Sequence, residues 1–181
     1  PTDTAVTKEK YSANTYDSGK KLNRAVQVMA AAEECGDTEN AEKLLNGIKA
    51  ELADWFTATG EENDNYFYYD EEVGSLFGFP QSYYSVDGIQ DHHFHYGYFI
   101  NAAAQVALRD SSFVQQYGNI IDELIADFAT TEENNPNSRY PQLRYFSQYE
   151  GHSWASGHAN FADGNNEESS SEELNAWAGL I

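Results

Sequence analysis

The sequence has few of the residues that fix a fold or a site through covalent bonds or metal. Cys35 is its single cysteine, so we expect no disulfide within the chain and no cysteine-based zinc site. No run approaches the roughly 18 consecutive apolar residues of a membrane span, and we expect no membrane partner. The first residues, Pro1-Thr2-Asp3-Thr4, also lack the charged and apolar regions of a secretion signal.

Basic residues are scarce, above all in the second half of the chain. All six lysines lie before residue 50, and only Arg109, Arg139 and Arg144 follow them. The formal net charge is −20 at pH 7. Such a chain repels nucleic acid and anionic membranes, so we exclude nucleic acid as a partner. A solvating acidic surface explains the excess, but adaptation to salt or an acidic cleft would explain it as well.

The apolar residues recur at helical spacing in the first third of the chain. A helix is predicted from Ser18, with Gly36 as its stop. Asp37 or Thr38 is expected to cap a second helix that reaches Trp55. The short turn between them predicts an antiparallel helical hairpin. The first apolar stripe consists of Leu22, Ala25, Val26 and Met29.

A second helical hairpin is predicted between residues 93 and 128. The helix from about His93 to Arg109 is apolar nearly all round, which is typical of a buried helix. Ser111 or Ser112 is expected to cap its partner. A last helix begins near Glu168, and its apolar side, which includes Leu174 and Trp177, has no evident partner within the chain.

Two long segments, residues 60–90 and 130–166, separate these helices. The first is predicted to be irregular or short extended structure, and the second is rich in Asn, Pro, Ser and Gly. Long loops of this kind inside a domain are usually functional, so we expect both to line a cleft. The fold class is therefore all-α. Helical hairpins with their long loops at one end suit a toroid, which five helices would form only in part, within a single domain spanning residues 1–181.

The segment Asp91–Phe99 packs three histidines, one acid and four aromatic residues into nine positions. Asp91 precedes a helix, so its carboxylate would ordinarily cap the first turn. His95 and Tyr98 follow at i+4 and i+7 on the same helix face, and the three residues could instead line one wall of a cleft. A carboxyl group among aromatic residues can serve as a general acid.

A metal site is the competing interpretation of the same segment. His92, His93 and His95, together with Asp91, supply enough ligands for one ion. Adjacent histidines, however, point in different directions on a helix, and the chain has no HExxH motif. We therefore predict no metal and no cofactor.

Acidic residues are also concentrated at the start of the last helix. Glu168 and Glu172 are four residues apart and share one face. A structural explanation is available, because Ser169 and Glu172 fit a capping box. The functional alternative is a catalytic carboxylate, with Trp154 and Asn165 on the preceding loop as stacking and hydrogen-bonding groups for a sugar. Glycoside hydrolysis requires two carboxyl groups of this kind.

Three segments in this order closely resemble glycoside hydrolase family 81, the endo-β-1,3-glucanases. They are Asp91–Phe99, Glu150–Gly157 and Gly164–Glu172, the last followed by Asn175-Ala176-Trp177. Phe67–Asp70 and Ser18-Gly19-Lys20 resemble weaker family segments. The resemblance implies an (α/α)6 toroid and endo-hydrolysis of 1,3-β-glucosidic linkages with inversion.

Carried onto matching positions, the resemblance implies Asp91 as general acid and Glu168 as general base. Glu172 would orient water or act as an alternative base. His95, Tyr98 and Trp154 would line the cleft, and Asp70 is a further candidate for substrate binding. The implied partner is a β-1,3-glucan, the implied location is extracellular or in a cell wall, and we expect a monomer.

The chain departs from the family at two points. Glu167 stands where the family usually has Gln, and its charge would raise the pKa of the neighbouring base. The family's large β-rich domain and its further helices do not occur within the 181 residues. A glucan-binding or degenerate module without catalysis is therefore the second hypothesis. A metal-dependent hydrolase that uses residues 92–95 is the third.

Overall fold

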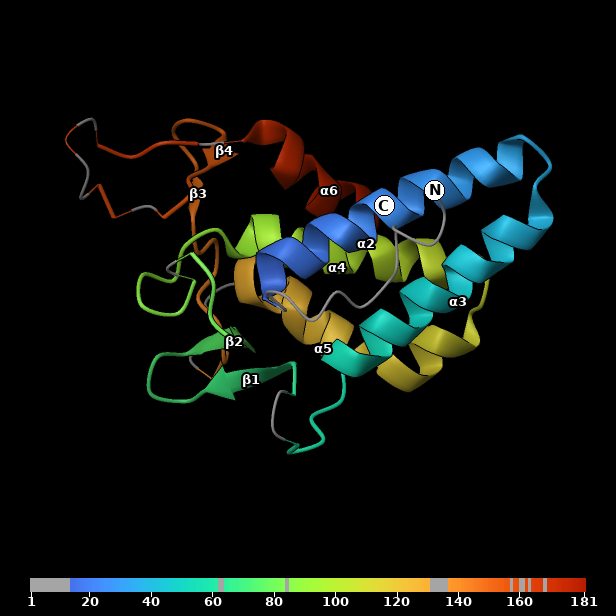
Figure 1. Cartoon of the computed structure of the whole chain (residues 1–181). Helices are drawn as coiled ribbons and strands as arrows, with labels where there is room; N and C mark the ends of the chain where they lie inside the picture. Colours follow the sequence, from blue (N-terminus) through green and yellow to red (C-terminus); the bar gives the residue numbers. More distant parts are fainter. Residues whose placement is uncertain are drawn as a thin grey trace.

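The computed structural model describes residues 14–61, 64–83, 85–130, 137–156, 158, 159, 162, 164–167 and 169–181. In this part five helices pack side by side, and two β-hairpins lie at one end of them (Figure 1). The helices are α2 (Thr15–Glu34), α3 (Thr38–Trp55), α4 (His92–Ala107), α5 (Ser112–Ala129) and α6 (Ser170–Leu180). The strands are β1 (Tyr66–Asp70), β2 (Ser75–Phe79), β3 (Phe146–Ser147) and β4 (His152–Ser153). The all-α class with helical hairpins is confirmed.

The two predicted helical hairpins are α2–α3 and α4–α5. The first turns at Gly36, whose φ of 74° favours glycine, and Asp37 then caps α3 by accepting from the backbone N–H of Asn40 at 3.2 Å. Both expectations are confirmed. At α5 the expected serine cap is wrong. Asp110 accepts from the backbone N–H of Ser112 at 3.1 Å, while Ser111, at the cap position, makes no side-chain cap bond.

Helix α4 occupies the centre of the structure, as its all-round apolar sequence predicts. Every residue from His92 to Ile100 is buried, and α2, α3, α5 and α6 all contact α4. The rings of Trp55 on α3 and Phe67 on β1 lie 5.3 and 5.2 Å from that of Phe99, measured between centroids. This aromatic contact joins both ends of the chain segment 55–67 to the central helix.

Residues 60–90 contain the short extended structure that the sequence predicts. Strands β1 and β2 pair antiparallel, with Tyr66 opposite Phe79 and Asp70 opposite Ser75. Asp70 closes the turn, because its carboxylate accepts from the backbone N–H groups of Glu72 at 2.9 Å and Val73 at 3.1 Å.

Helix α6 begins at Ser170, close to its predicted start near Glu168, but its cap and its packing differ from the predictions. Ser169 makes no side-chain cap bond, so the predicted capping box does not form. The expectation of an unpartnered helix is also wrong. Ala176 is fully buried against α4, whereas Leu174 is 62 % exposed. The buried residues of α6 are Glu173 and Ala176, and Trp177 packs edge-on against Phe128 of α5.

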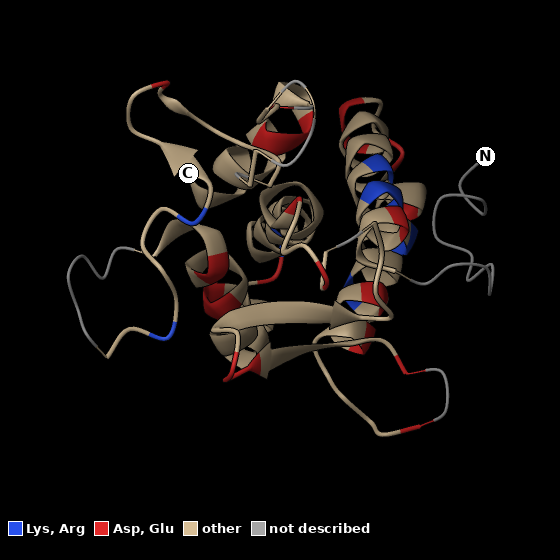
Figure 2. Cartoon of the chain, turned by 90° about the vertical axis from the view of Figure 1, so that its left-hand side faces the viewer, with Lys and Arg blue, Asp and Glu red and all other residues tan. Residues whose placement is uncertain are grey.

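Helices α2, α4 and α6 all run in the same direction, so their N-terminal ends lie at one end of the molecule (Figure 1). The hairpins and the loops before α4 and α6 gather at that end, which faces the viewer in Figure 2. No helix in the described ranges is long and apolar enough to cross a membrane.

Candidate active site

Asp91 stands at the N-terminus of α4 in an unusual backbone conformation. Its φ of 60° and ψ of 18° are left-handed, and its side chain makes no cap bond with the helix. The predicted capping role is therefore wrong. The backbone of Asp91 is instead held on both sides: its N–H donates to the carbonyl of Ala155 at 2.9 Å, and its carbonyl accepts from the N–H of His95 at 2.9 Å. A left-handed non-glycine residue held in this way is a candidate for function.

Glu172, in the first turn of α6, is the point where three helices converge. Tyr98 of α4 donates its hydroxyl to Glu172 Oε1 at 2.6 Å. Burial, followed by Glu172, raises the pKa of Tyr98. Tyr16 of α2 also lies close enough for Glu172 to contribute to raising the pKa of its hydroxyl, and Lys20 Nζ donates to Tyr16 at 3.3 Å. Hydroxyl donors and a nearby ammonium suit an ionised carboxylate.

His95 is buried and contacts Thr15 and Tyr16 at the start of α2. Its Nδ1 is 2.9 Å from Thr15 Oγ1, and its ring centroid lies 5.2 Å from that of Tyr16. Burial lowers the pKa of His95 to about 3, so the imidazole is neutral at ordinary pH. With only 2 % of the residue exposed, His95 offers little surface to a sugar and instead supports the contact between α2 and α4.

Main-chain hydrogen bonds around Trp154 and Ala155 lie beside Asp91. Trp154 donates its N–H to the carbonyl of Tyr145 at 3.0 Å, and the N–H of Ala155 donates to the carbonyl of Asn166 at 2.9 Å. The carbonyl of Ala155 also accepts from the N–H of Asp91. The adjacent residue, Trp154, is therefore held close to Asp91 in space. Its indole is partly exposed and packs edge-on against His152 at 4.5 Å between ring centroids.

Asn165 and Asp70 have structural partners in the described part of the chain. The side-chain oxygen of Asn165 accepts from the backbone N–H of Ala159 at 2.6 Å. Asp70 closes the β1–β2 turn. Glu168, the predicted base, lies outside the described residues. Its neighbour Glu167 is described, and burial followed by the charge of Glu173 raises the pKa of the Glu167 carboxyl.

Comparison with known proteins decides the family. Residues 2–181 match the family described as glycosyl hydrolase family 81 C-terminal domain. The chain belongs to glycoside hydrolase family 81. A glucan endo-1,3-beta-D-glucosidase of Acetivibrio thermocellus is 47 % identical over 172 residues, which cover 94 % of this chain and 22 % of the relative. One of Thermobifida fusca is 44 % identical over 170 residues, covering 91 % of this chain and 22 % of the relative.

A solved structure supports the same conclusion at the level of the fold. The family 81 glycoside hydrolase of Clostridium thermocellum superposes with a TM-score of 0.86 at 46 % identity, over 93 % of this chain and 24 % of that one. The partial helical toroid expected from the family is therefore confirmed. The chain spans about a quarter of the length of these family 81 proteins.

The histidines of this family 81 chain do not converge on one point. His92 binds Asp127 and the carbonyl of Ser85, and His95 binds Thr15. In the part of the chain that the structure describes, no group of three or more histidine, cysteine, aspartate or glutamate side chains could hold a metal ion.

Tyr16 was not predicted as a site residue. Residues 1–17 are polar and carry no apolar pattern, so the predicted helix starts only at Ser18. Helix α2 begins at Thr15, with Asn14 as its cap, and this places Tyr16 in the first turn. The cap residue Asn14 was the signal available, because asparagine is favoured at N-caps.

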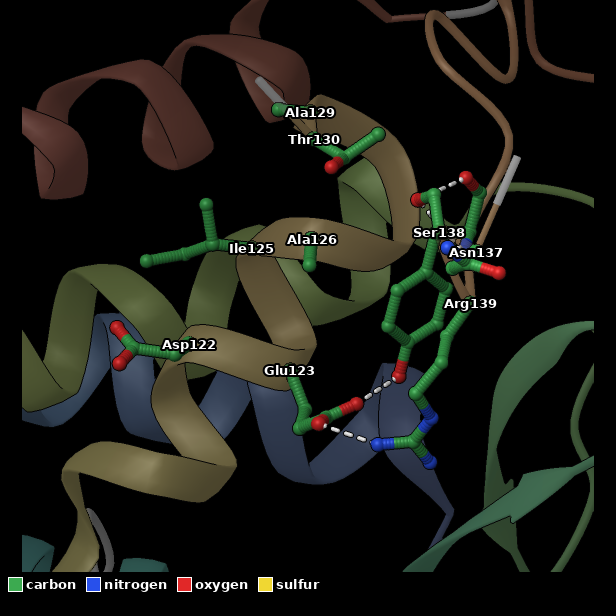
Figure 3. Close-up of a pocket in the computed structure, with 10 residues that line it drawn as sticks. Asp122, Glu123, Ile125, Ala126, Ala129, Thr130, Asn137, Ser138 and Arg139 are labelled. Atoms are coloured by element: carbon green, nitrogen blue, oxygen red, sulfur yellow. Dashed lines mark hydrogen bonds and ion pairs between the residues drawn. The ribbon is translucent and has the colours of Figure 1, made fainter. Parts of the chain in front are cut away.

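A pocket of about 450 Å³ lies elsewhere, on the outer side of α5 (Figure 3). Its wall includes Glu123, which accepts from Arg139 Nη1 at 2.6 Å and from the hydroxyl of Tyr140. None of the residues predicted for the active site lines this pocket.

Proposed function

We propose that this chain forms part of the catalytic cleft of an inverting endo-1,3-β-glucanase. The observation that supports this most directly is the arrangement at the N-terminal ends of α4 and α6. There, Tyr98 of α4 binds the carboxylate of Glu172, and Asp91 begins α4 without using its side chain as a helix cap. The names of the family 81 relatives supply the substrate class, a β-1,3-glucan.

The surroundings of the two described carboxyl groups suit different roles. Glu172 accepts a hydrogen bond from the Tyr98 hydroxyl and lies near Lys20, which suits a group that accepts hydrogen bonds from water. It would orient the attacking water or act as a base. Asp91, near the aromatic ring of Tyr145, would carry the proton needed by the leaving sugar. Glu168 completes the proposal as the general base.

In the proposed reaction, Asp91 gives its proton to the glycosidic oxygen as the bond from that oxygen to the anomeric carbon breaks. A water molecule attacks the same carbon from the opposite face and loses a proton to Glu168, so that one water is consumed and the configuration inverts. Inversion requires about 6.5–9.5 Å between the two carboxyl groups, enough for the water. Trp154 would contact the sugar, with Asn165 and Asp70 as further candidates, while Tyr98, which is buried, would hold the Glu172 carboxylate in place.

The test is hydrolysis of laminarin by the purified chain, followed through new reducing ends. Asp91→Asn and Glu168→Gln should each lower turnover by about a thousandfold or more, and Glu172→Gln by at least tenfold, the range for groups that transfer or position a proton. Glu39→Gln is the matched control, because that side chain is 80 % exposed on α3 and should leave turnover unchanged.

Three outcomes distinguish the hypotheses. Near-normal turnover in Asp91→Asn would remove that residue from the chemistry. Binding of laminarin by the wild type without new reducing ends would favour the glucan-binding module. A chain that neither binds nor cleaves laminarin would contradict the proposal. Since the substrate is a polymer of cell walls, we place the enzyme outside the cell or in a wall.

A further inference from the structure

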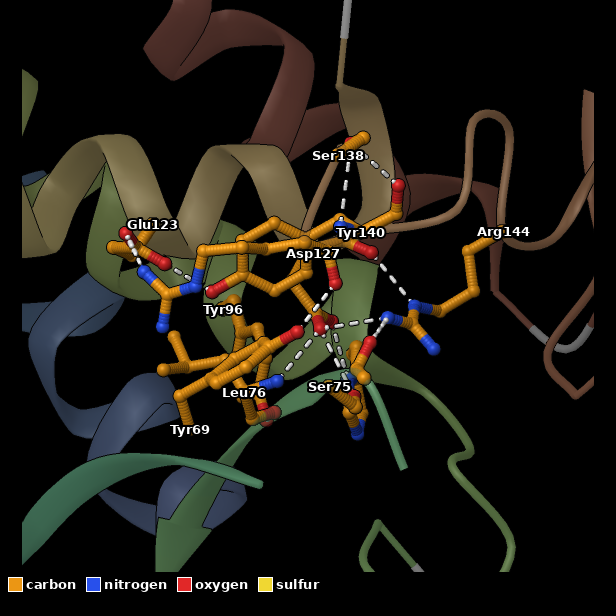
Figure 4. Close-up of polar contacts among 12 residues, drawn as sticks. Tyr69, Ser75, Leu76, Tyr96, Glu123, Asp127, Ser138, Tyr140 and Arg144 are labelled. Atoms are coloured by element: carbon orange, nitrogen blue, oxygen red, sulfur yellow. Dashed lines mark hydrogen bonds and ion pairs between the residues drawn. The ribbon is translucent and has the colours of Figure 1, made fainter. Parts of the chain in front are cut away.

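A fully buried charge network lies directly behind the Asp91 turn. Asp127, in the last turns of α5, accepts through Oδ1 from Ser75 Oγ and from the backbone N–H of Leu76, both at 2.9 Å, and from Arg144 Nη2 at 3.0 Å (Figure 4). Its other oxygen, Oδ2, lies 2.5 Å from Nδ1 of His92. The side chains of Asp127 and His92 are both 0 % exposed. A charge pair is buried in this way only where its partners satisfy it.

The geometry determines which partner each ring nitrogen of His92 binds. Its Nε2 lies 2.7 Å from the carbonyl oxygen of Ser85, which can only accept, so Nε2 carries a hydrogen. Burial alone would raise the pKa of Asp127, but His92 and Arg144 together with the hydrogen-bond donors hold it below its ordinary value. The carboxylate is therefore ionised, and it accepts a charge-assisted hydrogen bond from Nδ1 of His92.

This ion pair anchors the residue that follows Asp91. The side chain of His92 bridges α5, through Asp127, and the loop before α4, through Ser85. The N–H of Asp91 is held by Ala155. The left-handed backbone of Asp91 is thus fixed on one side by a main-chain bond and on the other by the His92 side chain. The side chains of His92 and Asp127 are both fully buried, so neither can touch a substrate.

We propose that the buried His92–Asp127 ion pair is the device that sets the direction of the Asp91 carboxyl, and that both are positioning residues for proton donation. The inference rests on the proposed function. A displacement of about 1 Å at a reacting group can lower turnover by about a hundredfold, so the anchor matters for kcat well before the fold is lost.

Two substitutions of the same residue separate the two bonds of His92. In His92→Gln the side-chain amide reaches the position of Nε2 and keeps the bond to Ser85, but the contact with Asp127 is lost. In His92→Asn the amide stands in for Nδ1 and keeps the contact with Asp127. We expect kcat on laminarin to fall about a hundredfold in His92→Gln, with KM within about threefold, and about tenfold or less in His92→Asn.

Native-state amide hydrogen exchange gives a second measurement, independent of catalysis. In the wild type, the Asp91 amide and the His92 Nδ1–H should give similar free energies of opening, each obtained from its exchange rate and its own intrinsic rate, because one opening exposes both. In His92→Gln the Asp91 amide should exchange at least tenfold faster, while that of Leu108 at the other end of α4, which donates to Ala104 at 3.0 Å, stays unchanged. Asp110→Asn is the control substitution, because it breaks the 2.5 Å ion pair with Lys49 at the Leu108 end of α4. It should leave exchange of the Asp91 amide unchanged.

The outcomes keep this inference separate from the proposed function. A folded His92→Gln variant with wild-type kcat and an equally protected Asp91 amide overturns the positioning role. If the wild type does not cleave laminarin, the proposed function fails, but exchange at Asp91 still decides whether the ion pair holds the turn. If His92→Gln does not fold, the wild-type measurement decides: a free energy of opening at the Asp91 amide far below that at the His92 Nδ1–H excludes the anchor.

Discussion

Two glutamates that lie five positions apart near the start of α6 have opposite surroundings. Glu172 accepts a short hydrogen bond from Tyr98, whereas Glu167 Oε1 is buried and has no hydrogen-bond partner among the described residues. Burial and the nearby charge of Glu173 raise the pKa of the Glu167 carboxyl above its unfolded value. The folded state therefore binds the proton of Glu167 more tightly than the unfolded state does.

The raised pKa of Glu167 makes part of the free energy of unfolding dependent on pH. A raised folded pKa contributes stability that is present below the unfolded pKa and is lost as the pH rises through the folded pKa. Glu167→Gln, which mimics the protonated group, should therefore leave the free energy of unfolding unchanged near pH 4. Near pH 7 it should increase that free energy by about 0.5 kcal/mol, within the range of partly exposed substitutions.

Urea unfolding of both proteins at the two pH values measures the effect. Glu150→Gln, on an exposed turn, serves as the control. An equal gain at both pH values would show that packing, not ionisation, distinguishes Glu167→Gln from the wild type.

At the scale of the elements, the close packing of α6 on α4 depends on glycine. A Cβ added at Gly97 would lie 2.8 Å from the Cβ and 2.9 Å from the backbone nitrogen of Ala176, so the two helices would have to separate. Gly97→Ala should lower the free energy of unfolding by about 1–3 kcal/mol, the cost of overpacking a core. It should also lower turnover, because α6 carries Glu172.

Gly118 on α5 provides the matched control for this substitution. A Cβ at Gly118 would meet only a Val114 methyl group, at 3.7 Å. Gly118→Ala should therefore gain about 0.5–1 kcal/mol, the difference in helix propensity. Urea denaturation of both variants tests the contrast. If Gly97→Ala were as stable as Gly118→Ala, the close approach of α4 and α6 would be wrong.

For the molecule as a whole, the dominant electrostatic feature is self-repulsion. Acidic residues are spread over the end seen in Figure 2, while most basic residues gather on the helices at the right of that view. Cross-element ion pairs such as Arg109–Glu33 offset only part of a net charge of −20. Excess charge of one sign destabilises the compact state, and salt screens it.

We therefore expect added salt to stabilise the protein. Raising NaCl from about 0.01 M to about 0.15 M shortens the screening length from about 30 Å to about 8 Å. At pH 7 this should raise Tm by about 2–4 °C, the shift that corresponds to about 1 kcal/mol in a chain of this size. Calorimetry at pH 7 and again near the pI of 4.3, where the effect should vanish, measures it. A lower Tm in salt would mean that the ion pairs outweigh the repulsion.

The sequence by itself determined the helices, both helical hairpins and the family. Apolar spacing and caps act over a few residues, which is why the stripe from Leu22 to Met29 and the Asp37 cap are predictable from the local pattern alone. The motifs around Asp91 and Glu172 predict a site at the ends of α4 and α6 for the same reason. They are short runs whose chemistry can be recognised without knowing what lies opposite them.

Only the tertiary structure decided what these residues touch. Tyr98 and Glu172 are 74 positions apart, and His92 and Asp127 are 35 apart, so no local pattern predicts either contact. Asp91 has the sequence position of a cap, yet a left-handed backbone turns its side chain away from that role. Long-range contacts hold the backbone in that conformation. Local preferences such as helix propensity and capping are too weak to oppose them.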